Sequence, residues 1–233
     1  MKAIILAAGV GSRMGKYTKS LPKGMVKING KTLIERQIQV LKAVGINDIV
    51  IVTGYYSKMI NYKGVKYFHN KNYQTTNMIE SLMCAKSEFD QDLVITYADL
   101  IYTEDLMRRL IDNNQLVSVC VDSDWKNYWY HRYGTIETDL ESLTINSGKI
   151  TELGSPVQSS EGIDYRYIGV LKFSIKIIPT ILSIYEKKKK HQMSWAKSGN
   201  TFMNGYMTDF LYEMIINDIV VHPVMGDKQW IEI

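Results

Sequence analysis

The chain has 233 residues, of which 45% are hydrophobic and 22% are charged, and its formal net charge is +4. This composition excludes a disordered or collagen-like chain, and so mild a charge gives no reason to expect nucleic acid as a partner. No apolar run approaches the roughly 20 residues that span a bilayer, so no membrane association is expected. The two cysteines, Cys84 and Cys120, lie far apart without metal-ligand spacing. We therefore expect a reducing, cytoplasmic location.

Strand and helix patterns alternate along the first half of the chain. Apolar runs predict buried strands at 2–8, 48–52, 65–68, 93–97 and 116–121. Helical spacing of apolar residues predicts helices over 33–44, 77–86 and 106–111. This alternation is typical of βαβ units in a mostly parallel sheet.

The regular alternation of strand and helix patterns ends in the second half of the chain. Asn146-Ser147-Gly148 predicts a hairpin turn inside 133–153. Further elements are predicted as a strand at 165–174, helices at 175–186 and 202–216, and strands at 220–221 and 230–232. We expect a single α/β domain over 1–233, with a Rossmann-like three-layer α/β/α architecture and a small β-rich embellishment.

A glycine-rich loop follows the first strand. It reads Leu6-Ala7-Ala8-Gly9-Val10-Gly11-Ser12-Arg13-Met14-Gly15 and continues to Pro22-Lys23. Backbone N–H groups exposed after a strand can hold phosphate oxygens, and Arg13, Lys16, Lys19 and Lys23 bring positive charge to the same loop. The glycine spacing fits neither G-x-G-x-x-G nor a Walker A loop. An ordinary βα turn with surface lysines is the alternative interpretation.

This loop resembles the signature of the small-molecule nucleotidyltransferases, which join a nucleoside triphosphate to a phosphorylated metabolite and release pyrophosphate. The resemblance implies that Arg13 grips the outgoing phosphates and that Lys23 lies beside the α-phosphate. The nucleotide site that it implies comprises Leu6, Ala7, Ala8, Gly9, Gly11, Ser12, Arg13, Lys23, Asn77, Tyr97 and Ala98. On this basis 1–121 is the expected nucleotide-binding half and 122–233 the acceptor-binding half.

Asp99 comes just after the predicted strand at 93–97. Ligands of parallel sheets collect at this carboxyl edge, and Mg²⁺ prefers one or two carboxylates together with phosphate oxygens. Asp99 also matches the metal-binding Asp of the family. A helix N-cap is the alternative role, but Thr103 or Glu104 is better placed to start the next helix.

The second half resembles a narrower branch of the family. Asp122-x-x-Trp125-x-x-x-Trp129-x-x-Arg132-Tyr133 is similar to a segment of cytidylyltransferases that act on phosphocholine-like, phosphonate or phospho-amino-acid acceptors. An aromatic wall around an Arg suits an ammonium-bearing acceptor, and a basic side chain suits its phosphate. The expected acceptor site comprises Trp125, Trp129, Arg132, Tyr133, Lys172 and Asp209. Core packing at i, i+4 of one helix is the alternative for the two tryptophans.

Glu232 is the second expected ligand of the metal. In the family, a carboxylate from a late strand faces the first across the ion, and strand alternation puts Trp230 and Glu232 on one side. In this branch Trp-x-Glu-Ile is commonly followed by Asp, whereas here Ile233 is the last residue given. A solvated chain end is the alternative.

Taken with its motifs, the resemblance implies a Mg²⁺-dependent cytidylyltransferase. It would transfer CMP from CTP to a phosphoglutamine, aminoalkylphosphonate or phosphocholine type of acceptor, to activate a cell-surface polysaccharide or lipid modification. The alternatives are a sugar-1-phosphate nucleotidyltransferase using UTP or dTTP, and a non-catalytic nucleotide-binding regulatory module. The acceptor's identity, a homodimer and fusion to a further domain stay open.

Overall fold

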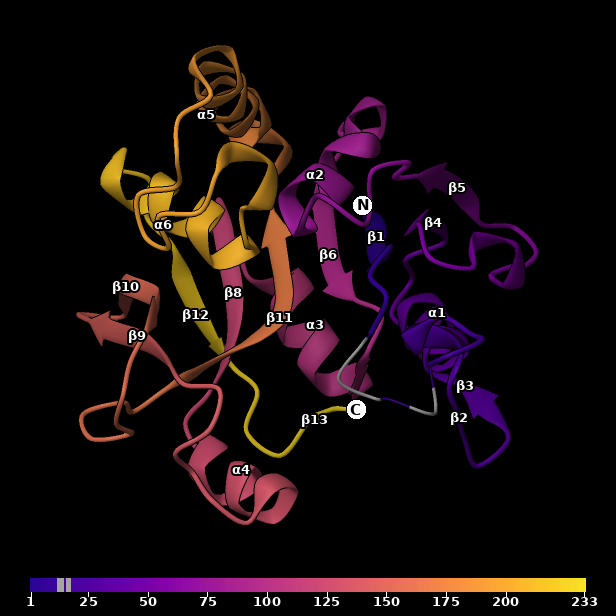
Figure 1. Cartoon of the computed structure of the whole chain (residues 1–233), viewed down its shortest axis with the longest axis horizontal. Coiled ribbons are helices and arrows are strands. Elements are labelled where there is room, and N and C mark those ends of the chain that lie inside the picture. Colours follow the sequence, from indigo (N-terminus) through magenta and orange to yellow (C-terminus); the bar gives the residue numbers. More distant parts are fainter. Residues whose placement is uncertain (12–14, 16–17) are drawn as a thin grey trace.

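A seven-stranded sheet lies at the centre of the computed structural model, which describes residues 1–11, 15 and 18–233. The strand order is β12 (His222–Met225), β8 (Val117–Asp122), β11 (Arg166–Phe173), β6 (Leu93–Tyr97), β1 (Lys2–Ala7), β4 (Asp48–Thr53) and β5 (Lys66–His69) (Figure 1). Strand β11 runs antiparallel to both of its neighbours, and the other neighbouring pairs are parallel. The predicted mostly parallel sheet is confirmed.

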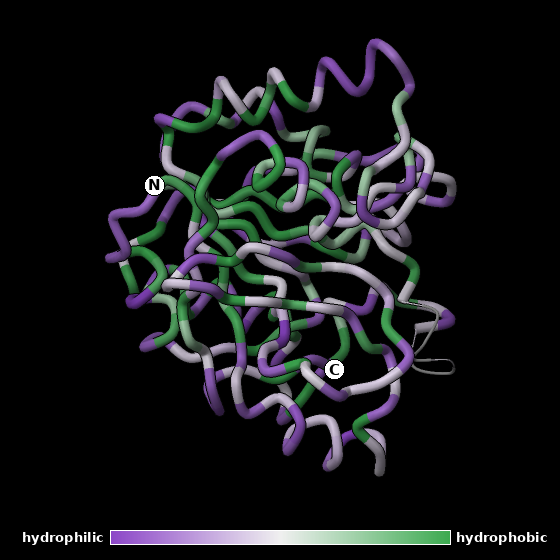
Figure 2. The backbone as a smooth tube through the Cα atoms, turned by 90° about the vertical axis from the view of Figure 1, so that its left-hand side faces the viewer, coloured by the Kyte–Doolittle hydropathy of each residue, from purple (hydrophilic) through white to green (hydrophobic). Residues whose placement is uncertain are grey.

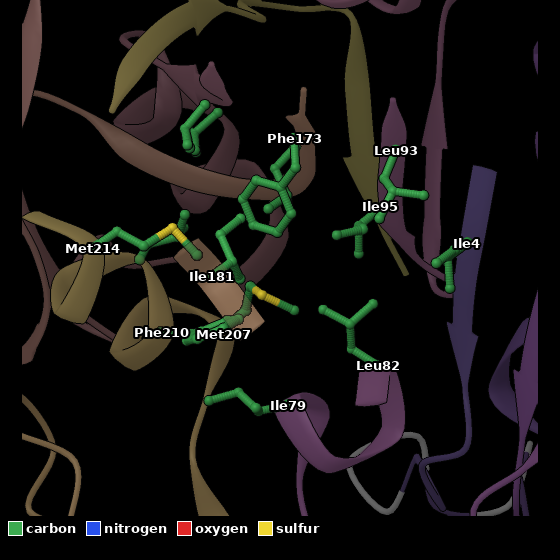
Figure 3. Close-up of a cluster of buried hydrophobic side chains, with 14 of the residues drawn as sticks. Ile4, Ile79, Leu82, Leu93, Ile95, Phe173, Ile181, Met207, Phe210 and Met214 are labelled. Atoms are coloured by element: carbon green, nitrogen blue, oxygen red, sulfur yellow. The ribbon is translucent and has the colours of Figure 1, made fainter. Parts of the chain in front are cut away.

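Helices cover both faces of the sheet. Ile4 and Leu6 of β1 join the apolar cluster that includes α2 (Met78–Cys84), α5 (Ile178–His191) and α6 (Met207–Ile216). Figure 3 shows this cluster, with side chains from the sheet meeting those of the three helices. Alternate residues of β1, such as Ile5, join the cluster on the other face with α1 (Leu33–Ala43), α3 (Glu104–Asp112) and α4 (Trp125–Tyr133). The alternation of a strand buried on both sides therefore produces three layers.

Three small pairs of strands lie outside the central sheet. They are β9 (Glu141–Asn146) with β10 (Lys149–Pro156), β7 (Leu100–Tyr102) with β13 (Trp230–Glu232), and β2 (Lys27–Ile28) with β3 (Lys31–Thr32). The first is the predicted β-rich hairpin. The second carries the end of the chain back to the residues that follow β6, with Glu232 opposite Leu100 (Figure 1).

The predicted elements of the first half are confirmed within a few residues. In the second half, the helix predicted at 202–216 begins at Met207, and the strand predicted at 220–221 lies at 222–225. Strands β2, β3 and β7 were not predicted, because two or three residues are too few to show a period. Figure 2 shows the hydrophobic segments gathered in the interior. In the described ranges, no helix combines the length and apolarity needed to cross a lipid bilayer.

Candidate active site

A pocket of about 280 Å³ opens where β1 and β6 end side by side. Every residue of the predicted nucleotide site that the structure describes lines it: Leu6, Ala7, Ala8, Gly9, Gly11, Lys23, Asn77, Tyr97 and Ala98. The predicted site did not include five other residues that line the pocket: Gly24, Tyr73, Thr76, Met78 and Ser81. Ser12, Arg13 and Lys16 lie outside the described residues.

Gly11 lets the two halves of the signature approach each other. Its φ is +66°, and a Cβ at this position would lie 2.9 Å from Cβ of Lys23. Only a residue without a side chain adopts this backbone at no steric cost and leaves room for the lysine stem. The glycine therefore fixes where Lys23 enters the pocket.

Lys23 lies between two carboxylates. Its Nζ is 2.8 Å from Oδ2 of Asp99 and 3.9 Å from Oε1 of Glu232. Glu232 in turn meets Arg132, with Nη1 of the arginine 3.1 Å from Oε2. We call these four side chains the charged cluster. Asp99 and Glu232 thus meet Lys23 from distant parts of the sequence, and Arg132 joins them through Glu232.

Asp99 is held by the backbone around it. It follows β6 directly, and its carbonyl accepts a hydrogen bond from the Ile233 N–H at 3.1 Å. Its Oδ2 pairs with Lys23, but Oδ1 is buried with no hydrogen-bond partner among the described residues. A buried carboxylate oxygen without a partner is costly. Oδ1 is therefore well suited to accept a cation.

The segment that contains α4 anchors the terminal strand. The Tyr128 hydroxyl accepts from the Glu232 N–H at 2.9 Å and donates to its carbonyl at 2.8 Å. Asp122 accepts from Trp230 Nε1 at 2.8 Å, and burial raises the pKa of this carboxyl to about 6. Trp230 is buried while Ile231 is 40% exposed, as strand alternation predicted. The motif at 122–133 thus holds the strand that carries Glu232.

A second pocket, of about 690 Å³, adjoins the first. The two share Met78, Tyr97 and Asp99 as walls. The second pocket's other polar and aromatic lining residues are Asp139, Glu141, Arg166, Tyr167, Ser198, Asn200, Tyr206, Thr208 and Glu232. We call it the acceptor pocket, because its position beside the nucleotide pocket suits a second substrate.

Most of the predicted acceptor residues lie elsewhere, so we withdraw them as direct contacts. Trp125 and Trp129 are at most 1% exposed and pack in the core, as the alternative interpretation held. Lys172 is buried at the opposite end of β6, beside Val94, where its Nζ donates to the carbonyls of Ile111 and Asn113. An apolar helix face and a buried sheet position explain these placements better than a ligand does.

The remaining acceptor predictions have indirect roles. Asp209 accepts hydrogen bonds from the Ser198 N–H and hydroxyl and from the Tyr206 N–H, each at 2.9 Å. It therefore holds two residues of the acceptor pocket without lining the pocket itself. The Arg132 guanidinium lies 4.9 Å from the ring centre of Tyr133 and pairs with Glu232. Neither Arg132 nor Tyr133 lines the pocket.

One glycine also shapes the acceptor pocket. Gly169 has φ +89°, and a Cβ there would lie 2.7 Å from the ring of Tyr97. The Tyr97 hydroxyl is 3.1 Å from that of Tyr167, and burial raises the pKa of both phenols. The irregular pairing of β11 at this point therefore lets the Tyr97 ring form the wall between the two pockets.

Comparison with known proteins places the chain in a family. Residues 3–162 match the family described as the MobA-like NTP transferase domain. The chain is 36% identical to CTP:phosphoglutamine cytidylyltransferase of Campylobacter jejuni over 244 residues, covering 100% of this chain and 95% of that protein. It is 34% identical to 2-aminoethylphosphonate cytidylyltransferase of Lancefieldella rimae over 236 residues, covering 97% and 85%.

A solved structure shares the fold. CTP:phosphocholine cytidylyltransferase of Streptococcus pneumoniae superposes with a TM-score of 0.74 at 24% identity, covering 100% of this chain and 92% of that one. The predicted α/β fold is confirmed by this likeness, and the predicted family by the sequence matches. With its glycine loop, charged cluster and paired pockets, the chain belongs to the MobA-like NTP transferases and is an enzyme of their cytidylyltransferase branch.

Proposed function

We propose that this enzyme transfers CMP from CTP to a small phosphorylated or phosphonate acceptor, releases pyrophosphate and uses Mg²⁺. The observation that carries the proposal is the shared wall. A nucleotide pocket and an acceptor pocket meet at Asp99, beside Lys23 and Glu232. The names of the two relatives support a nitrogen-containing phosphate or phosphonate as the acceptor.

The charged cluster fits a magnesium ion. Asp99 Oδ1 is buried without a hydrogen-bond partner among the described residues, and Glu232 lies opposite, with the Lys23 ammonium between the two carboxylates. Within the described ranges no three His, Cys, Asp or Glu side chains form a metal site, which suits an ion that takes two carboxylates and completes its shell with water and phosphate. When bound, Mg²⁺ neutralises charge on the phosphates.

The side chains of the cluster position charge rather than move protons. An acceptor phosphate is already anionic, so its oxygen attacks the α-phosphorus in line without a general base. Lys23 leaves Asp99 for the phosphates, where its ammonium meets charge that grows in the transition state. The loop backbone orients the nucleotide, and both pockets hold the reacting oxygen near phosphorus.

The biological setting that we propose is cytoplasmic. Residues 1–121 form the nucleotide-binding half and 122–233 the acceptor-binding half of one domain. The activated product serves modification of a cell-surface polysaccharide or lipid. The nucleotide pocket is built from residues 6–99, which supports this division.

Pyrophosphate release tests the proposal. The purified enzyme is incubated with Mg²⁺ and CTP, UTP, dTTP or ATP, together with phosphoglutamine, phosphocholine, 2-aminoethylphosphonate or glucose 1-phosphate. We expect release with CTP and one of the three nitrogen-containing acceptors. Preference for UTP or dTTP with glucose 1-phosphate would make the chain a sugar-phosphate nucleotidyltransferase. Nucleotide binding without release under any combination would make it a regulatory module.

A further inference from the structure

The acceptor pocket contains a carboxylate that the proposed reaction does not use. Glu141 opens β9 and lines the pocket with Tyr97 and Tyr167. Burial raises the pKa of both phenols, and the negative charge of Glu141 adds to this effect. No described residue makes a hydrogen bond or ion pair with this carboxylate.

The nearest positive charge is directed elsewhere. The Arg166 guanidinium lies 3.6 Å from the ring centre of Trp129, and it donates to the Asp139 carbonyl at 2.8 Å. Its Nη2 is also 3.5 Å from Oδ2 of Asp139. Arg166 therefore lowers the pKa of Glu141 only in part, and burial together with the charges of Asp139, Glu232 and Glu152 raises that pKa to about 7.

We propose that Glu141 is the counter-ion of a positively charged amine on the acceptor and selects cationic over neutral acceptors. This inference rests on the proposed function and names the acceptor's class: a phosphate or phosphonate joined through a short linker to a primary or quaternary ammonium. Among the described residues, the acceptor pocket is lined by four acidic side chains, Asp99, Asp139, Glu141 and Glu232, and one basic one, Arg166. The pocket therefore attracts a positive charge on the acceptor, at the end of the acceptor away from its reacting phosphate.

The positions of the carboxylates indicate which of them serve the phosphate of the acceptor and which one serves its ammonium. Asp99 and Glu232 belong to the charged cluster, where the acceptor's phosphate must meet the nucleotide. Glu141 is not part of that cluster and lines the acceptor pocket together with Tyr97 and Tyr167, whose aromatic rings suit an ammonium.

Matched acceptor pairs test the charge without changing the shape. Phosphocholine is compared with 3,3-dimethylbutyl phosphate, which carries carbon in place of the nitrogen, and 2-aminoethylphosphonate with propylphosphonate. At saturating CTP, we expect the native enzyme to favour the cationic member of at least one pair by about 10- to 100-fold in kcat/KM, the value of a charge-assisted hydrogen bond. In Glu141→Gln this ratio should fall toward one, and in Glu141→Asp it should fall less.

The control is Glu161→Gln, because Glu161 is exposed and lies outside both pockets. It should keep the native ratio. An unchanged ratio in a folded, active Glu141→Gln enzyme would overturn the role of Glu141 while leaving the proposed reaction intact. If no nucleotide and acceptor give turnover, calorimetric binding of the same pairs separates the two ideas. A preference for phosphocholine that is lost in Glu141→Gln would support the ammonium site without the reaction, and equal binding would reject it.

Discussion

Individual charged residues carry most of the chemistry of this site. Lys23 is 2.8 Å from Asp99 and 3.9 Å from Glu232, and Arg132 also pairs with Glu232, so two cations offset two carboxylates. In the proposed reaction, a cation takes the place of the Lys23 ammonium between the carboxylates, and Lys23 turns to the phosphates of the nucleotide.

Replacing Lys23 should cripple turnover. Lys23→Ala removes a positive charge that meets the transition state, so we expect kcat to fall about 100-fold while the protein stays folded. Steady-state kinetics and circular dichroism check this. Lys27→Ala, an exposed lysine on β2, is the matched control and should keep native activity. Retention of more than half the activity by Lys23→Ala would exclude the assigned role.

The two carboxylates of the cluster should share one ion. In Asp99→Asn and Glu232→Gln, we expect the magnesium concentration for half-maximal rate to rise about 10-fold, because each change removes one anionic ligand. Asp105→Asn, which alters an exposed carboxylate of α3, should leave the magnesium curve unchanged. An inactive Asp99→Asn beside an unchanged curve for Glu232→Gln would leave the site with a single carboxylate.

Glu141 should lower stability at neutral and alkaline pH. Its pKa is about 7 in the folded protein, above its ordinary value near 4.5, so the folded state holds the proton more tightly. The stability that this proton gives is complete below pH 4.5 and is lost as the pH rises through 7. Glu141→Gln should therefore unfold with a free energy about 2 kcal/mol higher than native at pH 8, but nearly equal at pH 4.5. Urea titrations at both pH values measure this, and a constant difference would contradict it.

At the scale of elements, α4 and β13 form a unit. Helix α4 is built around two buried tryptophans, and its Tyr128 and Arg132 reach across to the terminal strand. That strand brings Glu232 to Asp99 through its pairing with β7. A segment that resembles an acceptor-binding motif thus holds Glu232, a proposed metal ligand, in place.

Loosening this unit should weaken the metal site indirectly. Tyr128→Phe removes the hydroxyl that bonds both the N–H and the carbonyl of Glu232. We expect the magnesium demand to rise in the same direction as in Glu232→Gln but by less, about 3-fold, since the carboxylate is retained. Tyr130→Phe changes a neighbour that is 62% exposed and should behave as native. Equal curves for the two variants would mean that β13 is held by its other contacts.

For the molecule as a whole, the two pockets are built from elements that are far apart in the sequence. The nucleotide pocket draws on β1, β6, α2 and the turn at Lys23, and the acceptor pocket adds the hairpin β9–β10, β11 and β13. A ligand that bridges these elements stabilises the folded state as one unit.

Nucleotide binding should therefore raise the melting temperature. At 100 times its Kd, CTP with Mg²⁺ adds about 2.7 kcal/mol, which corresponds to a rise in Tm of about 5–10 °C for a chain of this size. Differential scanning calorimetry with CTP and UTP at equal concentrations measures the preference. An equal rise with UTP would remove the support for a cytosine-specific pocket.

The sequence by itself determined the sheet, its helices and the nucleotide pocket. These are local features: strand β1, the glycines and Lys23 lie within 22 residues, and period and spacing are read directly along the chain. Asp99 was predicted because it follows a strand at the edge where ligands collect, and Glu232 because the family resemblance implies a second carboxylate from a late strand.

Only the tertiary structure decided the acceptor pocket. Its walls come from residues between Met78 and Glu232 that no local period connects. The pattern of Trp125 and Trp129 fits a core helix and a ligand wall equally well, and burial separates the two. Lys172 lies at the wrong end of its strand because β11 runs antiparallel to β6. Glu141 carries no motif, and its place in one pocket with Tyr97 and Tyr167, without a hydrogen-bond or ion-pair partner among the described residues, exists only once the chain has folded.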